Sequence, residues 1–448
     1  MSTINLNTTT ASSGTGIDVS SVVDQILYTE RAPERLWQQQ QTTLKSQATV
    51  LTGINSNMAS LSSSANALKD ILGAIAAKTA TSSQNNILTA SAQPSASAGI
   101  HVIKVANLAS MSTYYTDAVA SGAVLAPGTI QIQVGASTTR TVSIGSTNNT
   151  VSTLASSINE SGLGLTASVI RDSTGERLAL TSNTSGELGD ITVAGNSTGL
   201  SFHKSVTGHN ASFTLDGVGL STATNTVSGA LEGVTINLAS AAPDTEVLLT
   251  VAADQRGAEQ AVRNFVSSYN LVVSAINGQF ATGGDPSTAG PLASSGSLRT
   301  LESTLLSAAT YSIDENGGLV NLASLGIDMG NDGTLTVDST KLDDAINNHF
   351  TQFKNFFQAA GNAKGFAQNF SNIMSGLTDS TNGLLALNLT ENVNQQHILT
   401  RQINDMEDRL SNRQKQLIDQ YSRVDTMLRQ LPLLQAQITA QLNSVTKA

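Results

Sequence analysis

The chain has 448 residues and a net charge of −10, with 12% charged and 4% aromatic residues and no cysteine. The lack of cysteine excludes disulfides, cysteine nucleophiles and thiolate metal sites. The acidic balance, without any run of Lys or Arg, argues against binding to nucleic acid or to an anionic membrane surface, and no stretch approaches the length of a membrane span.

Residues 1–16 are small and polar, and they lack the basic and apolar regions of a cleaved signal peptide. We expect them to be disordered, because too few apolar groups are present to offset the entropy of ordering. The chain is expected either to stay in the cytoplasm or to leave by a route that uses no such signal. Residues 1–40 are assigned to an N-terminal segment that is first disordered and then helical.

Two helices are predicted between residue 17 and about residue 78, with a joint between them. Ser21–Asp24 fits a capping box, and Pro33, which the first turn of a helix tolerates, places the joint near Arg31–Pro33. Apolar residues then recur at alternating steps of 3 and 4, which predicts one stripe that needs a partner helix. The side chains of this stripe that we expect to pack in a helical leg are Leu44, Leu51, Ile54, Met58, Leu61, Leu68 and Leu72.

The middle of the chain has the alternating pattern of strands, divided by turns rich in Gly, Asn and Asp. Residues 127–206 are predicted to form a small, mostly β domain with one short helix at 151–158. Residues 81–126 with 207–255 are predicted to form a β head domain that carries this insertion. The expected strands are 100–105, 129–134, 142–144, 167–170, 177–180, 191–193, 212–215, 234–238 and 247–251.

Helical periodicity returns at residue 258, with helices expected at 258–276, 298–305, 342–353 and 366–377. A second stripe follows, and its leg-packing side chains are Leu399, Ile403, Met406, Leu410, Leu417, Val424, Met427 and Leu431. Pro432 should kink this helix or end a segment near Leu431, so residues 432–448 are assigned to a separate C-terminal helical segment. Residues 41–80 with 256–431 then make the helical leg domain.

The order helix, β, helix predicts an α+β multidomain fold. A helical bundle or coiled-coil leg, formed by the N- and C-terminal segments, carries inserted, mostly β head domains. The same spacing is the usual core face of any bundle helix. Antiparallel packing of the two stripes within one chain is therefore at least as well supported as self-association.

No catalytic or metal-binding pattern outweighs a structural interpretation. Gly195–Gly199 matches the nucleophile pattern G-x-S-x-G around Ser197, but no helical period follows it, so we interpret it as a turn. Asp328–Gly333 faintly resembles a calcium loop, but Gly330 and Ser339 occupy two of the ligand positions, which favours a β-turn. The histidines are scattered. We expect no cofactor, no metal and no catalysis.

Three regions of the chain closely resemble the flagellar filament cap, or hook-associated protein 2, family. The first is Gly16–Leu27 followed by Glu30–Pro33, and the second is the β module at 127–193, which is similar to a motif of flagellins and hook proteins. The third is the family's C-terminal region, carried by Ala211–Gly217, Asn225–Val227, Gly233–Thr235, Phe265–Asn270, Leu322–Ile327 and Asp332–Leu335. Leu431–Pro432–Leu433 departs from the uninterrupted polar helix that the family pattern leads us to expect.

The resemblance implies a structural role without catalysis. Caps of this family form a ring of identical subunits at the distal tip of the filament, where exported flagellin folds and is inserted beneath them. The resemblance implies that terminal helices form legs on the filament end and β domains form the plate. The implied partners are other copies of the chain, flagellin with the filament tip, and an export chaperone. The implied location is the flagellum, reached by the flagellar type III route without a cleaved signal peptide.

Two other structural roles are alternatives. One is another axial protein, either flagellin or a hook–filament junction protein, which Phe265–Asn270 and the position of the β motif disfavour. The other is a surface adhesin that binds host glycans through the β head, against which the sequence shows no aromatic sugar platform. An enzyme built around Ser197 is the weakest of the alternatives.

Overall fold

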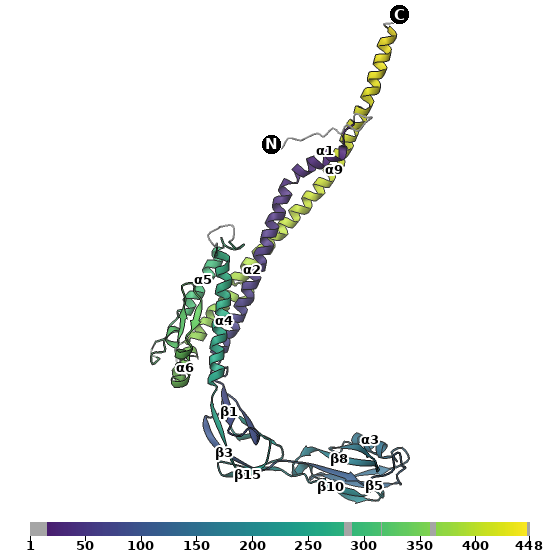
Figure 1. Ribbon diagram of the computed structural model, residues 1–448, viewed down its shortest axis with the longest axis vertical. Helices are drawn as coiled ribbons and strands as arrows, with labels where there is room; N and C mark the ends of the chain where they lie inside the picture. The colour runs from purple at the N-terminus through teal and green to yellow at the C-terminus, as the bar shows by residue number, and fades with distance from the viewer. Residues whose placement is uncertain (1–15, 282–288, 315, 359–363, 446–448) are drawn as a thin grey trace. The chain divides into compact units, whose positions relative to one another are not determined.

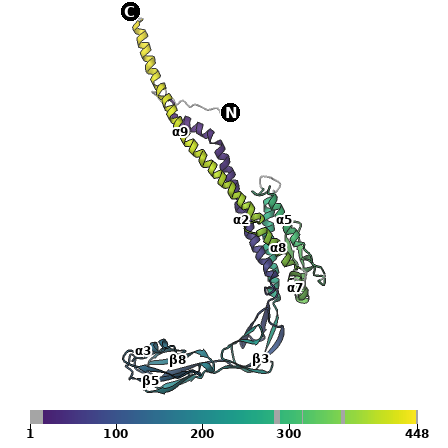
Figure 2. The same cartoon turned by 180° about the vertical axis from the view of Figure 1, so that it is seen from behind.

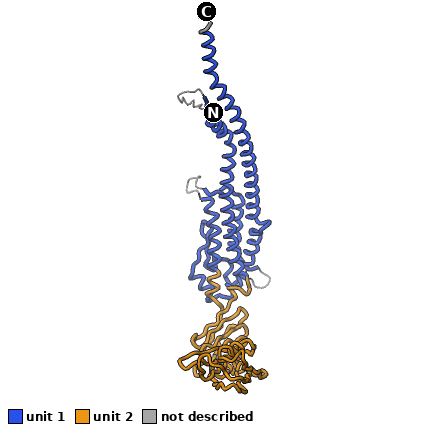
Figure 3. The backbone as a smooth tube through the Cα atoms, turned by 90° about the vertical axis from the view of Figure 1, so that its right-hand side faces the viewer, with its two compact units in different colours: residues 1–69, 262–448 blue, residues 70–261 orange. Residues whose placement is uncertain are grey.

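The computed structural model describes residues 16–281, 289–314, 316–358 and 364–445 (Figure 1). The chain divides into two compact units, one of residues 1–69 with 262–448 and one of residues 70–261 (Figure 3). Helices precede and follow a β-rich middle, so the α+β class and the predicted order are confirmed. The disorder expected for residues 1–16 falls, except at Gly16, outside the described residues.

Three helices form the leg of the first unit: the short α1 (Val19–Glu30) and the long α2 (Ala32–Lys69) and α9 (Leu384–Val445). The joint predicted near Arg31–Pro33 is confirmed, because Arg31 alone separates α1 from α2. The predicted capping box at Ser21–Asp24 is wrong. The cap is Asp18, whose side chain accepts the N–H of Ser21 at 3.2 Å and so satisfies a free helix donor.

Helix α2 ends at Lys69, earlier than the predicted end near residue 78. Asp70 begins a turn in which its Oδ1 accepts the N–H of Leu72 at 2.9 Å. Such a side-chain bond to the backbone competes with continuing the helix. The apolar spacing continues past the turn, but Leu72 lies outside the helix.

Helix α9 continues through Pro432 to Val445, so the segment end predicted near Leu431 is wrong. Proline removes one backbone hydrogen bond, whose acceptor is four residues earlier. The helix is solvent-exposed here, as the 52% exposure of Leu431 and the 68% exposure of Leu433 indicate. We infer that water satisfies the released carbonyl, which lowers the cost of keeping the helix continuous.

A bundle of further elements packs against α2 and α9. It comprises α4 (Gln255–Phe280, from Val262 onward), α5 (Gly296–Ala309), β16 (Ile327–Met329), β17 (Leu335–Val337), α6 (Ser339–Asn348), α7 (Phe350–Gln358) and α8 (Phe366–Thr378). The single helix predicted at 342–353 is two helices, divided at His349. The core of the bundle is aromatic: Phe265 meets Phe366 and Phe370 edge-on, at 5.7 and 5.1 Å between ring centroids.

The second unit contains two β cores. The first core lies between a five-stranded sheet, ordered β1-β15-β3-β11-β12, and a three-stranded sheet, ordered β13-β14-β2. The strands of both are β1 (Lys78–Ser82), β2 (Leu88–Ala92), β3 (Gly99–Asn107), β11 (Ala211–Leu215), β12 (Val218–Thr222), β13 (Thr226–Leu231), β14 (Val234–Leu238) and β15 (Ala242–Ala253). Ile103, Phe213 and Leu249 are among its buried side chains.

The second β core contains the sheets β10-β4-β8-β7 and β6-β5-β9 with helix α3 (Val151–Glu160). Its strands are β4 (Met111–Thr116), β5 (Gly128–Val134), β6 (Arg140–Ile144), β7 (Leu165–Asp172), β8 (Gly175–Ser185), β9 (Ile191–Asn196) and β10 (Phe202–Val206). β4 pairs here with β8 and β10. The insertion therefore starts at Met111, before the predicted residue 127. The sequence of β4 lacks a clear apolar alternation, so the sequence pattern does not indicate this earlier start.

Candidate assembly surface on the helical leg

Helices α2 and α9 run antiparallel and lie side by side in two opposite views (Figures 1 and 2). Gln41 donates to Thr400 Oγ1 at 2.8 Å, and Asn392 donates to the carbonyl of Leu44 at 3.1 Å. Asn392 is buried, and its Oδ1 accepts from Gln396 at 2.7 Å. A buried amide that is satisfied in one alignment favours that alignment over others.

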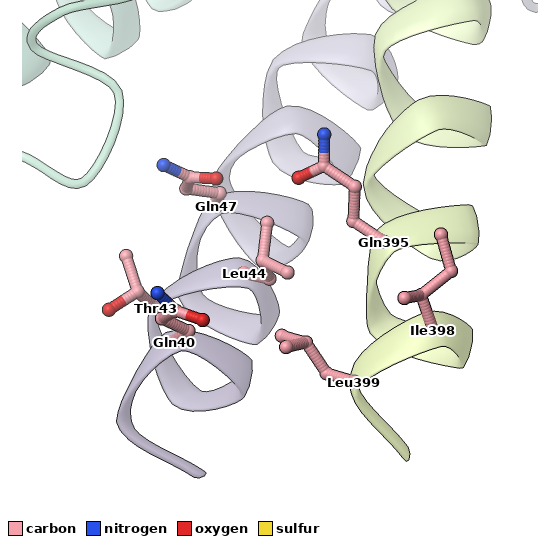
Figure 4. A pocket seen from close by; sticks show the side chains of 7 residues that line it. All are labelled: Gln40, Thr43, Leu44, Gln47, Gln395, Ile398 and Leu399. Atoms are coloured by element: carbon pink, nitrogen blue, oxygen red, sulfur yellow. The ribbon is translucent and has the colours of Figure 1, made fainter. Parts of the chain in front are cut away.

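A groove of about 480 Å³ lies between α2 and α9 at this level (Figure 4). Leu44 and Leu399 project into the space between the two helices, and Gln40, Gln47 and Gln395 lie around them. Long polar side chains replace apolar ones here, which leaves the helix pair less tightly packed at this level.

Above the groove, α1 covers α9. Val23 and Leu27 of α1 form a small buried cluster with Met406, Leu410 and Leu417 of α9. Partly buried side chains extend the cluster at its margins: Val19, Ile26, Trp37 and Tyr421. The residues of α9 in the cluster repeat at heptad spacing, so they form one face of the helix.

Ion pairs surround this cluster. Arg31 forms a bidentate contact with Glu407, at 2.7 Å from Nη1 to Oε1 and 2.9 Å from Nη2 to Oε2. Its Nη1 also lies 2.8 Å from Oε2 of Glu34, and Arg413 reaches Glu30 at 3.3 Å. The hydrogen bonds from Arg31 lower the pKa of Glu407, because they stabilise its charged form.

A polar contact joins the two ends of the described leg. The backbone N–H of Ile17 donates to Oδ1 of Asp425 at 2.9 Å, and Arg429 donates to Oδ2 at 2.8 Å. The hydrogen bond from Arg429, followed by that from Ile17, lowers the pKa of Asp425. The pairing of the N-terminal segment with α9 thus extends to the first described residues.

The structure places the predicted leg-packing residues in three groups. The buried ones are Leu51, Ile54, Met58, Leu61, Leu68, Leu399, Met406, Leu410 and Leu417. Leu44 and Ile403 are partly buried. Leu72 is 66% exposed and lies outside α2, so its expected packing in the leg is wrong.

Val424, Met427 and Leu431 are exposed in the chain, at 39%, 66% and 52%. The same spacing continues with exposed Leu434 and Ile438. We call these five side chains the distal stripe. The expectation that Val424, Met427 and Leu431 pack within one chain is wrong. The apolar contacts between α1 and α9 end at Tyr421, and only the polar contact of Ile17 with Asp425 lies further along α9.

Ser197 and Asp332, the central residues of the two candidate chemical motifs, make hydrogen bonds within local turns. Ser197 Oγ accepts the N–H of Thr129 at 2.9 Å in a turn after β9. Asp332 accepts from the N–H and hydroxyl of Thr334, at 3.0 and 2.7 Å, as in an Asx turn. Within the described ranges no cluster of His, Cys, Asp or Glu could hold a metal, and no helix there is long and apolar enough to cross a membrane.

The sequence pattern does not single out the polar residues that position the leg. Arg31, Glu34, Glu407 and Asn392 lie at or beside the α1–α2–α9 interfaces. The sequence pattern that these residues share is a charged or amide side chain beside an apolar stripe. That pattern indicates an exposed helix face equally well, so it could not have been assigned without the partner helix.

Two family models match the chain: the Flagellar hook-associated protein 2 N-terminus over residues 15–112 and the Flagellar hook-associated protein 2 C-terminus over residues 208–432. The chain is similar to the B-type flagellar hook-associated protein 2 of Pseudomonas aeruginosa strain PAO1, with 32% identity over 401 residues, which is 82% of this chain and 84% of that protein. It is 26% identical over 463 residues to the flagellar hook-associated protein 2 of Escherichia coli K12, covering 96% and 97% of the two chains.

The fold is also similar to a solved structure. The D1-D2-D3 domains of the flagellar cap protein FliD from Escherichia coli match with a TM-score of 0.60 and 23% identity, over 76% of this chain and 99% of that chain.

Proposed function

The chain belongs to the flagellar hook-associated protein 2 family, and from this premise we propose how it acts as a structural cap of the flagellum. Its terminal helices form a leg within each subunit, and the distal stripe is the surface that meets the filament end. The buried and partly buried leg-packing side chains of the two heptad faces hold α1 and α2 on α9 in the same subunit.

The proposal rests on a change in the burial of the apolar stripe of α9 at about Tyr421. Before it, Met406, Leu410 and Leu417 are buried under α1. After it, the same heptad spacing continues, but the side chains of the distal stripe are exposed. An apolar stripe of this kind on a surface helix indicates an interaction site. The occupant we propose is the helical surface of subunits at the filament end.

We propose that copies of the chain form a ring at the distal filament tip. The β-rich residues 70–261 are the source of contacts between neighbouring subunits, in addition to those of the leg. Flagellin is the proposed partner beneath the ring, where the cap promotes its folding and polymerisation and prevents the loss of exported subunits.

We propose export through the flagellar type III route without a cleaved signal peptide. An export chaperone is a proposed partner before assembly. The exposed apolar side chains of a free subunit favour aggregation, and a chaperone that binds them would prevent it. We propose no catalysis, since the hydroxyl of Ser197 and the carboxylate of Asp332 both serve local turns.

Native mass spectrometry with negative-stain microscopy of the purified full chain tests this function. A cap gives small closed rings or stacked plates of a fixed number of subunits. Long helical filaments of the protein alone would instead support a flagellin-like role. A monomer at all concentrations, in the presence of filament ends as well, would contradict the proposal.

A further inference from the structure

Arg31 occupies an unusual position, because it is the one residue between α1 and α2 and its side chain contacts both α2 and α9. Its Nη1 donates hydrogen bonds to Glu34 at 2.8 Å and to Glu407 at 2.7 Å. Its Nη2 donates to the second carboxylate oxygen of Glu407 at 2.9 Å. Arg31 is 36% exposed and Glu407 is 47% exposed, whereas the side chain of Glu34 is only 4% exposed. One guanidinium thus connects three helices at the joint.

We propose that Arg31 and Glu407 set the register in which the N-terminal helix docks on α9. The inference rests on the proposed function in one respect, namely that the docked α1 decides how much of the α9 stripe is left for the filament. The positioning role itself concerns a single subunit and can be tested without any assembly.

The apolar face of α9 cannot set this register alone, because it is a repeat. A slip of α9 by one heptad brings Leu399, Ile403 and Leu410 to the places now held by Met406, Leu410 and Leu417. All three replacements are apolar, so the contact with α1 is preserved. A heptad repeat of this kind specifies a stripe without specifying the alignment along it.

The charges remove this ambiguity. The same slip puts Thr400 opposite Arg31 in place of Glu407, and Met406 opposite Glu30 in place of Arg413. Both ion pairs across the interface are then lost. A slip in the other direction puts Gln414 opposite Arg31 and Arg413 into the apolar cluster, so it is disfavoured twice.

Glu34 increases the cost of losing the side chain of Arg31. Its carboxylate is buried and is held by Arg31 and by the amide of Gln38, at 2.9 Å. A buried carboxylate without a cationic partner is unfavourable. Arg31 is suited to this place because its planar fork reaches two carboxylates at once, which the single ammonium of lysine does less well.

Spin-label distances test the proposal in the full chain, which offers no cysteine of its own. Labels at Gln25→Cys on α1 and Gln420→Cys on α9 are both at exposed positions. The parent should give one narrow distance. Arg31→Glu should broaden it or add a population displaced by about 10 Å, the length of one heptad of helix. Arg31→Lys should give a distance distribution of intermediate width.

Charge exchange separates positioning from a general loss of stability. Arg31→Glu with Glu407→Arg should restore the narrow distance, since the pair is re-formed with its signs exchanged. Arg423→Glu is the matched control, because Arg423 pairs with Asp419 within α9 at 2.8 Å and should change nothing. A narrow, unshifted distance in Arg31→Glu would overturn the proposal, as would failure of the exchanged pair to restore it. Absence of rings in the parent would count against the proposed function and leave these distances interpretable.

Discussion

The backbone N–H of Ile17 donates a hydrogen bond of 2.9 Å to the side chain of Asp425, across 408 positions of sequence. The contact fixes the N-terminal end of α1 on α9 and marks the level at which coverage of α9 by the described part of its own chain ends. Beyond it lies most of the distal stripe. The leg thus has an inner part that is complete within one chain and an outer part that offers an apolar face.

Leu417→Asp should undock α1. Leu417 is 3% exposed and contacts the cluster that includes Val23 and Leu27, so a carboxylate there is buried without a partner. We expect hydrogen exchange of the α1 amides to become at least tenfold faster and the leg to melt earlier. Exchange and melting equal to the parent would show that α1 does not pack on this face.

Leu434→Asp should act on assembly alone. Leu434 is 51% exposed on the distal stripe, so the change should leave the melting temperature of the free subunit within about 2 °C. Binding to filament ends should fall, as measured by co-sedimentation with flagellin filaments at matched concentrations. Gln435→Asp, an exposed neighbour off the stripe, is the control for the added charge and should assemble normally. Equal loss in both variants would mean that charge, and not the apolar face, matters.

Phe370→Ala should destabilise the bundle around α8. Phe370 is fully buried and contacts Phe265 and Phe366, so truncation leaves a cavity. The expected loss is about 3–5 kcal/mol in the free energy of unfolding, measured with denaturant. Leu271→Ala on α4 is the control, because its side chain is 55% exposed and its loss should cost less than about 0.5 kcal/mol.

Docking of α1 should weaken in acid. The pKa of Glu407 lies below its ordinary value of 4.5 because of Arg31, and that of Asp425 lies below 3.8 because of Arg429 and Ile17. A lowered pKa in the folded state contributes stability above the ordinary value, and this contribution is lost as the pH falls through the folded pKa. The spin-label distance between α1 and α9 should therefore be constant from pH 7 to about 5 and broaden below about 4.5. A profile that is flat to pH 3 would show that these contacts do not hold α1.

The sequence predicted the presence of the helices better than the residues at which they begin and end. Ladder positions such as Ile54 and Leu410 are buried, since a stripe of constant spacing marks one face of a helix. The spacing does not show where the partner helix ends, so Met427 and Leu410 are indistinguishable in the pattern. Local polar chemistry set the ends: Asp70 stops α2, and Asp18 starts α1.

The polar part of the site could not be predicted in the same way. Arg31 and Glu407 are 376 positions apart, and neither belongs to an apolar pattern. Their pairing follows from the antiparallel register of α1 and α9, which only the folded chain supplies. Pro432 shows the reverse case, in which a strong local signal for a break gives way because the helix is surrounded by solvent.

Location of the protein on intact flagella tests the central claim most directly. Ser173, in the exposed turn before β8, can be replaced by cysteine, and the lack of any other cysteine makes a gold label specific to that position. Electron microscopy of labelled filaments should show gold at the distal tip alone, with the label lost in Leu434→Asp. Gold distributed along the filament, or confined to the junction with the hook, would contradict the assignment as a cap.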